Sequence, residues 1–203
     1  MKHSKTAKGA RPPKELRDET RRDEIVTAAR ECVVRRGFHA ASMAEIAATA
    51  RMSVGQIYRY FINKEAIIHA IVERIVSNRL RMLNETAGRP DQPETMAELL
   101  AFGFPEEFRD DDILMLEVTA ESTRNGVVAE IVKRADERLH AEAVTSFERD
   151  HPGLSAETRA ARLELLAVLF EGTLLRRMTV RPVGTAALRE LYLAIIGKLL
   201  SEE

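Results

Sequence analysis

The chain of 203 residues is 45% hydrophobic, which provides enough apolar material for a core and excludes disorder as the default state. Aromatic residues are scarce and only seven prolines interrupt the chain, a composition that favours helix. No apolar run approaches the roughly 20 residues that span a bilayer, no signal-peptide pattern opens the chain, and a lone cysteine excludes a disulfide framework. We therefore expect a cytoplasmic protein with no membrane segment.

The net charge of −1 conceals two halves of opposite sign. Residues 1–64 hold 14 Lys and Arg against 7 Asp and Glu, whereas residues 65–203 hold 17 against 25. A basic N-terminal part joined to an acidic remainder predicts an N-terminal module that binds a polyanion. The alternative is a solvated basic tail.

The first 13 residues carry four cations, no acids and two prolines, so we expect residues 1–19 to form a basic flexible arm. From about Thr20 a helical stripe begins, and Gly37 supplies its stop. Cys32 lies within this stripe, which indicates a small core residue and not a nucleophile. The other apolar members of the stripe are Ile25, Ala28, Ala29 and Val33.

Two short helices follow, each opened by the spacing of a capping box. Ser42 to Glu45 opens the first, which ends near Arg51, and Ser53 to Gln56 opens the second 11 residues later. Two short helices joined by a three-residue turn describe a helix-turn-helix, whose second helix lies in the DNA major groove. Ala47 is small enough to let the two helices approach closely, and the shared apolar wedge is predicted to comprise Ile46, Ala50, Met52 and Ile57.

Three aromatic residues, Tyr58, Tyr60 and Phe61, stand almost side by side on the second short helix. They point in different directions, so they cannot all be buried. Ile57 and Phe61 are four residues apart and are predicted to face inward. The residues left available to DNA are Val54, Gln56, Tyr58, Arg59 and Tyr60.

The rest of the chain is predicted to be helical as well. Asn63 has the position of an N-cap, and the helix from Lys64 to about Asn84 has one broad apolar face long enough to link two parts of the molecule. No strand-like alternation longer than a few residues appears, so we predict an all-α protein of about nine helices. Further helices are expected at Glu94–Phe104, Asp110–Arg124, Gly126–Asp150, Ser155–Thr179 and Thr185–Ser201.

The stretch from Arg22 to Val72 resembles the N-terminal domain of the TetR family of transcriptional regulators. The resemblance rests on Gly37-Phe38, Ile46-Ala47, Ser53-x-Gly55, Ile57-Tyr58-x-Tyr60-Phe61 and Lys64-Glu65 at the family's spacing. It implies a three-helix helix-turn-helix domain at residues 20–66, followed by an effector-binding and dimerisation domain at residues 67–203. The implied function is that of a repressor, released from an inverted-repeat DNA operator by a small-molecule effector of unknown identity. No enzymatic activity and no other cofactor are implied.

The resemblance also implies contacts with the DNA backbone. Ser42 and Tyr60 would bond phosphates, and Lys64, at a helix start, would add a point charge where the sequence indicates no structural partner for it. Tyr60 stands where the family often has His, and its hydroxyl can serve a phosphate similarly. Arg51 stands where the family usually has Gly. If this position needs a positive φ, Arg strains it; alternatively, Arg51 extends the first short helix and adds a cation near DNA.

Base recognition falls to the remaining exposed positions of the second short helix. Val54 is a candidate for contact with a thymine methyl, and Gln56 for a bidentate contact with adenine. Tyr58 suits either backbone or base, and Arg59 either a phosphate or a guanine. The alternatives are that Gln56 only closes its own capping box and that Arg59 is a solvated surface charge.

The last two predicted helices are apolar almost all round, so they should be buried on all sides. The resemblance supplies the partner: these helices would form a four-helix bundle with a second subunit in a homodimer. Gly172 and Gly197 would ease their close crossing. The alternative is that both helices lie inside a monomeric core.

An effector pocket is expected among the helices between the linker helix and the dimer bundle, lined by flexible apolar side chains. Glu117 and Glu121 could face a cationic ligand there, or pair with Arg124 or Arg177. The alternative for every apolar candidate is ordinary core packing. The apolar candidates are Met82, Met96, Phe102, Phe104, Phe108, Met115, Phe147, Phe170 and Met178.

Two other classes compete with a DNA-binding regulator: a small all-helical enzyme and a helical scaffold that binds only protein. The five histidines, at positions 3, 39, 69, 140 and 151, show no metal-ligand spacing, and the chain has no Gly-rich phosphate loop and no nucleophile motif. The basic arm and the helix-turn-helix argue against both classes.

Overall fold

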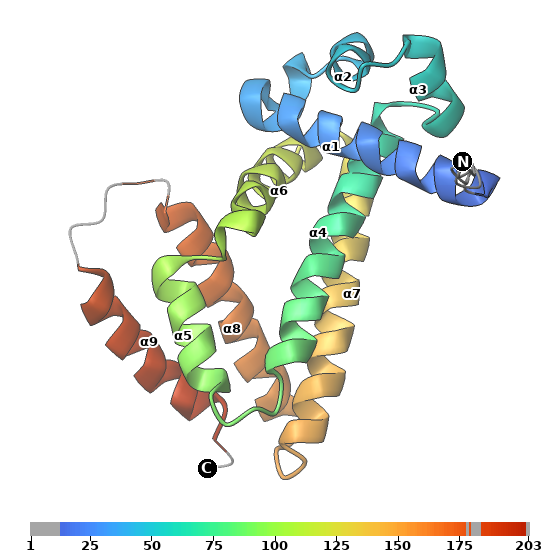
Figure 1. Ribbon diagram of the computed structural model, residues 1–203. Coiled ribbons are helices and arrows are strands. Elements are labelled where there is room, and N and C mark those ends of the chain that lie inside the picture. The colour runs from blue at the N-terminus through green and yellow to red at the C-terminus, as the bar shows by residue number, and fades with distance from the viewer. Residues whose placement is uncertain (1–12, 178, 180–183, 202–203) are drawn as a thin grey trace, which may run out of the picture. The chain divides into compact units, whose positions relative to one another are not determined.

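The computed structural model describes residues 13–177, 179 and 184–201 (Figure 1). Within these residues the chain forms nine α-helices, one 3-10 helix and no strand, so the predicted all-α fold is confirmed. The chain divides into two compact units at the boundary between Ile67 and Ile68, which lies inside helix α4. We call the two parts the N-terminal unit and the C-terminal unit.

The N-terminal unit consists of α1 (Lys14–Ala40), α2 (Met43–Thr49), α3 (Val54–Tyr60) and the first turn of α4 (Lys64–Thr86). Helix α1 lies across α2, and α2 leads through a tight turn into α3 (Figure 1). The core of this unit is made by the predicted apolar stripe of α1 and by the inward faces of the other helices: Ile25, Ala28, Ala29, Cys32, Val33, Phe38, Ile46, Ala47, Ile57, Phe61 and Ile67.

Helix α1 begins six residues earlier than the periodicity predicts. Pro13 stands at its N-cap and the helix starts at Lys14, so residues 14–19 are helical and not part of an arm. These first turns hold a single apolar residue, Leu16, which is 52% exposed, so the apolar stripe on which the prediction depended does not extend into them. The remainder of the expected arm, residues 1–12, lies outside the described residues. At the other end Gly37 has a φ of 77°, which kinks α1 before it ends at Ala40.

The C-terminal unit holds the rest of α4 and five further α-helices, close to the predicted spans. These are α5 (Gln92–Phe102), α6 (Arg109–Ser122), α7 (Gly126–Asp150), α8 (Ala156–Arg177) and α9 (Thr185–Leu199). A short 3-10 helix, η1 (Glu106–Phe108), is not predicted by the residue pattern. Helix α5 lies between α8 and α9 (Figure 1), and Arg138 of α7 donates a hydrogen bond to Glu73 of α4 over 2.7 Å. One core cluster joins α5, α7, α8 and α9 through Leu100, Phe147, Leu163, Leu166 and Ile196.

Helices α8 and α9 expose apolar side chains within the single chain. Their exposed fractions are 55% for Val168, 57% for Leu175 and 61% for Leu191, with Leu165 and Ile195 also exposed. A monomeric core would bury these side chains, so that alternative does not fit the structure. At Gly172 and Gly197 an added Cβ would meet nothing within 4 Å, so this chain alone gives no packing reason for either glycine.

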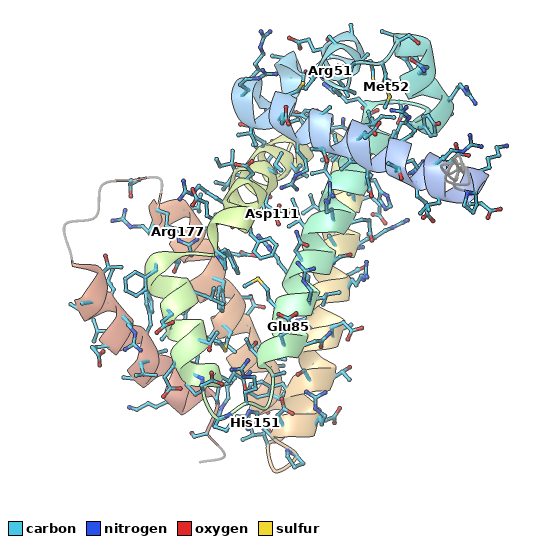
Figure 2. All side chains as sticks on the ribbon, in the orientation of Figure 1. Arg51, Met52, Glu85, Asp111, His151 and Arg177 are labelled. Carbon is cyan, nitrogen blue, oxygen red and sulfur yellow. The ribbon has the colours of Figure 1, made fainter. Side chains whose placement is uncertain are left out.

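A polar cluster joins four helices of the C-terminal unit. The Arg177 guanidinium at the end of α8 donates to Asp112 Oδ2 over 2.8 Å and to the carbonyl oxygen of Leu99 over 2.9 Å. Asn78 of α4 donates to Asp111 Oδ2 over 3.1 Å. Figure 2 labels Asp111 at the start of α6 and Arg177 at the end of α8. None of the described helices has both the length and the apolar character needed to cross a membrane.

Candidate nucleic-acid interface

Both short helices of the N-terminal unit are held at their starts by complete capping boxes. The backbone N–H of Glu45 donates to Ser42 Oγ, and that of Ser42 donates to Glu45 Oε2, each over 3.2 Å. At α3 the Gln56 N–H donates to Ser53 Oγ over 3.2 Å, and the Ser53 N–H donates to Gln56 Oε1 over 2.8 Å. The predicted boxes are confirmed, and Gln56 does have a capping role.

The turn between the two helices is closed by backbone hydrogen bonds. The Met52 N–H donates to the carbonyl oxygen of Ala47 over 2.9 Å, and the Arg51 N–H donates to that of Ala48 over 3.1 Å. This pair of bonds is the arrangement in which a helix ends on a left-handed residue. Arg51 has a φ of 54°, so it ends α2 in a strained conformation and does not extend the helix (Figure 2).

Helix α3 has one buried and one exposed face, as predicted. Ile57 is completely buried and Phe61 is 2% exposed, so both anchor the helix to the core. Val54 is 39% exposed and Tyr58 52% exposed, and Gln56 and Arg59 are exposed as well. Ile57 and Phe61 thus anchor α3, and its other side presents an outward face that is available to a ligand.

Ile62, which the sequence pattern does not mark as a site residue, follows the C-cap of α3 and is 80% exposed. An isoleucine between a buried Phe61 and the N-cap Asn63 gives no periodic signal, because the helix has already ended there. The side-chain oxygen of Asn63 accepts the N–H of Ala66 over 2.8 Å, which confirms the predicted cap of α4. Ile62 adds an apolar side chain to the surface next to α3.

Tyr60 differs from the expectation that it is freely available to DNA. Its side chain is half-buried, and its hydroxyl donates to Asp18 Oδ1 on α1 over 3.3 Å. Its carbonyl oxygen accepts a hydrogen bond from Arg22 over 2.7 Å, and the same guanidinium lies 4.4 Å from the centre of the Phe61 ring. Tyr60 therefore ties the end of α3 to the early turns of α1, and its contact with phosphate stays a prediction.

Lys64 also has a structural partner that the sequence does not reveal. Its Nζ donates to the carbonyl oxygen of Phe38 over 3.0 Å and lies 4.0 Å from the centre of the Phe38 ring. The premise that Lys64 has little structural work to do is therefore wrong. An ammonium group carries three donors, so a phosphate contact by Lys64 remains compatible with this arrangement.

Three predicted pocket residues meet at a small cavity in the C-terminal unit, which encloses about 10 Å³. Its walls are Met82, Phe104 and Phe108, together with four polar residues that the prediction did not include: Asn78, Arg79, Asp111 and Asp112. Burial raises the pKa of the Asp112 carboxyl, against the opposing effect of Arg177 and then Arg79. Burial likewise lowers the pKa of Arg79.

The other predicted pocket residues lie elsewhere. Phe147 belongs to the core cluster, and Met96 and Phe170 pack against it. These three residues therefore follow the alternative of ordinary core packing. Phe102 is 62% exposed, and Met178 lies outside the described residues. Periodicity alone cannot separate residues that line a cavity from residues of the core, because both face inward.

The remaining candidates lie on α6. Glu121 is 4% exposed and binds Arg124 over 2.7 Å, which is one of the two pairings that the sequence left open. Met115 and Glu117 are half-buried and do not line the cavity. Arg177, the other proposed partner, binds Asp112.

Residues 25–71 match the model of the family described as bacterial regulatory proteins, tetR family. Over 112 residues the chain is 35% identical to the HTH-type transcriptional regulator UidR of Escherichia coli (strain K12), a match that covers 55% of this chain and 57% of UidR. The chain therefore aligns with little more than half the length of this relative.

Solved structures extend the likeness of fold to most of the chain. Salmonella enterica GusR matches with a TM-score of 0.70 and 24% identity, over 89% of this chain and 95% of GusR. A putative transcriptional regulator from Saccharomonospora viridis, in complex with choline, matches with a TM-score of 0.67 and 19% identity, over 88% of this chain and 96% of that one.

Two capped helices on either side of a left-handed turn, the second with an exposed outer face, define a helix-turn-helix protein. The matched residues 25–71 contain this element whole. Residues 25–71 therefore form a helix-turn-helix domain of the TetR family of bacterial regulatory proteins, and UidR, the relative with 35% identity, is a transcriptional regulator.

Proposed function

We propose that the protein is a cytoplasmic, homodimeric transcriptional repressor that binds an inverted-repeat DNA operator and is released from it by a small-molecule effector. The observation that carries the proposal is the outer face of α3. Val54, Gln56, Tyr58 and Arg59 are exposed there, whereas Ile57 and Phe61 fix the helix to the core. Donors and apolar groups on one side of a rigid helix suit the edges of base pairs in a major groove.

The exposed apolar faces of α8 and α9 support the homodimer. Val168, Leu175 and Leu191 are each more than half exposed in the single chain. Contiguous exposed apolar surface on a protein marks an interaction site. A second copy of the chain supplies a surface of the same kind, so a two-fold bundle would bury both.

The cavity beside α4 and α6 supports a small-molecule effector. It joins the aromatic side chains Phe104 and Phe108 to buried carboxylates, a combination of apolar wall and few polar groups that suits ligand sites. The space it encloses is only about 10 Å³, far below the roughly 300–1,000 Å³ of a usual ligand pocket, so an effector would have to open it. The Saccharomonospora viridis relative holds choline within the same fold.

The DNA-binding part of the proposal is tested by measuring affinity for random duplex over a range of salt, then selecting bound sequences from a random pool. We expect affinity that falls as salt rises, because cations displaced from phosphates return at high salt. The selected sites should be inverted repeats with half-site centres about 10 base pairs apart or a larger multiple of this. A single unrepeated half-site, protected by one subunit, would contradict the dimeric arrangement.

The homodimer is tested by sedimentation at low micromolar concentration. Wild type should sediment as a dimer, and Val168→Glu combined with Leu191→Glu should give a folded monomer, because both side chains are exposed in the single chain. Val127→Glu is the matched control, since Val127 is 59% exposed but lies on α7. A stable wild-type monomer would overturn this part of the proposal.

The repressor and effector parts need a promoter. The protein should silence a reporter gene placed behind a selected operator. A compound that raises the melting temperature of the protein should restore expression of the reporter. Activation of the reporter by the protein would reverse the proposed sign of regulation.

A further inference from the structure

Arg51 is the only residue besides glycine with a positive φ in the described part of the chain. Its φ of 54° belongs to the left-handed region, where a Cβ crowds the backbone. The conformation is imposed by the end of α2. The Met52 N–H donates to the Ala47 carbonyl and the Arg51 N–H to the Ala48 carbonyl, and both bonds form only when the residue at the position of Arg51 is left-handed. Glycine would meet this requirement without strain.

Within the part of the chain that the structure describes, the side chain of Arg51 makes no polar contact that would offset this strain. It is exposed, and among the described residues its guanidinium forms no hydrogen bond and no ion pair. One local benefit is available, because a cation after the last turn of a helix interacts favourably with the helix dipole. Helix α2 has only seven residues, so this benefit is small.

The position of Arg51 points to a ligand outside the chain. It lies in the turn three residues before Val54, the first residue of α3, and thus at the end of the helix nearest the base pairs in a helix-turn-helix (Figure 2). A guanidinium is always charged and can bind a phosphate through two parallel hydrogen bonds.

We propose that Arg51 binds a DNA phosphate beside the base pairs that α3 contacts, and that the protein accepts a strained turn for this contact. The inference rests on the proposed DNA-binding function and adds a contact residue to it. It predicts that replacing Arg51 by glycine changes stability and DNA affinity in opposite directions. A residue kept only for folding cannot produce that pair of effects.

The test compares Arg51→Gly, Arg51→Ala and Arg51→Lys for melting temperature and for affinity toward random duplex across a salt series. Arg51→Gly should melt about 2–4 °C higher than wild type, because it removes the strain. It should also bind DNA more weakly, with a salt slope smaller by about one per subunit. Arg51→Ala should show the same decrease in salt slope but no increase in melting temperature. Arg51→Lys should keep the wild-type slope.

Lys133→Ala is the matched control, since it removes an exposed cation from α7 and should leave the slope unchanged. Arg51→Gly with the wild-type slope would overturn the inference while leaving the proposed function intact. A lower melting temperature for Arg51→Gly would show that the side chain serves the fold, and would overturn it as well. Wild type that binds no duplex at low salt would overturn the proposed function, and the Arg51 contact with it.

Discussion

The hydroxyl of Tyr60 donates a hydrogen bond to the Asp18 carboxylate over 3.3 Å, which joins the end of α3 to the first turns of α1. Asp18 is acidic and lies in a part of the molecule whose other features favour a polyanion. Its carboxylate would face the phosphate that Tyr60 is predicted to bind. Asp18 therefore positions Tyr60, and we expect its charge to oppose a phosphate bound there.

Asp18→Asn should strengthen binding to operator and to random duplex alike, because it removes a negative charge beside the DNA-facing surface and leaves an acceptor for Tyr60. The increase should shrink as salt rises, since salt screens the repulsion. Affinity measured at two salt concentrations checks this. Asp136→Asn, the same charge change on α7, is the control, and an equal increase there would show that only net charge matters.

Gln56 allows its capping role to be separated from base recognition. Gln56→Ala breaks the capping box of α3 and should cost about 0.5 kcal/mol of stability. Gln56→Glu keeps the oxygen that accepts from Ser53, so its stability should stay near that of wild type, but it replaces the amide donor by an acceptor. If Gln56 contacts adenine, Gln56→Glu alters base preference at one position per half-site; unchanged preference leaves only the capping role.

Lys64 should contribute to stability as well as to DNA binding. Lys64→Met removes the hydrogen bond to the Phe38 carbonyl and the charge above its ring, which should cost about 1 kcal/mol in a denaturant titration. The salt slope of DNA binding should fall by about one per subunit if the ammonium also meets a phosphate. Lys64→Arg keeps the charge and should keep the slope. A stability equal to that of wild type in Lys64→Met would contradict the structural role.

Asp112 gives the stability of the C-terminal unit a pH dependence of known sign. Burial raises the pKa of its carboxyl above the ordinary 3.8, so the folded chain holds this proton more tightly than the unfolded chain does. Ionisation of Asp112 therefore lowers the stability of the folded chain. The whole cost is present at pH values above the folded pKa, and it disappears as pH falls through that pKa toward 3.8.

The measurement is the difference in melting temperature between wild type and Asp112→Asn from pH 7 to pH 4. It should shift in favour of wild type as pH falls, because only wild type gains from protonation at this position. Asp136→Asn, a change of one exposed charge on α7, controls for the loss of charge in general. A difference that stays constant with pH would contradict the effect of burial on Asp112.

The sequence by itself determined the features that depend on residues three or four apart. The capping boxes of Ser42 and Ser53, the burial of Ile57 and Phe61, and the starts of α4, α7 and α9 all follow from local spacing. A helix closes its hydrogen bonds within one turn, so the residues that cap it and the face that it buries can be predicted from a short stretch of chain.

The tertiary structure alone decided the partners of the charged and polar side chains. Tyr60 meets Asp18 from 42 residues away, Lys64 meets Phe38 from 26 and Arg177 meets Asp112 from 65. It also decided which of the predicted pocket residues line the cavity and which pack in the core, and it fixed Arg51 in a left-handed conformation that its residue type disfavours. Such pairs form when folding brings distant segments together, and the spacing of residues along one helix carries no information about which other segment it will face.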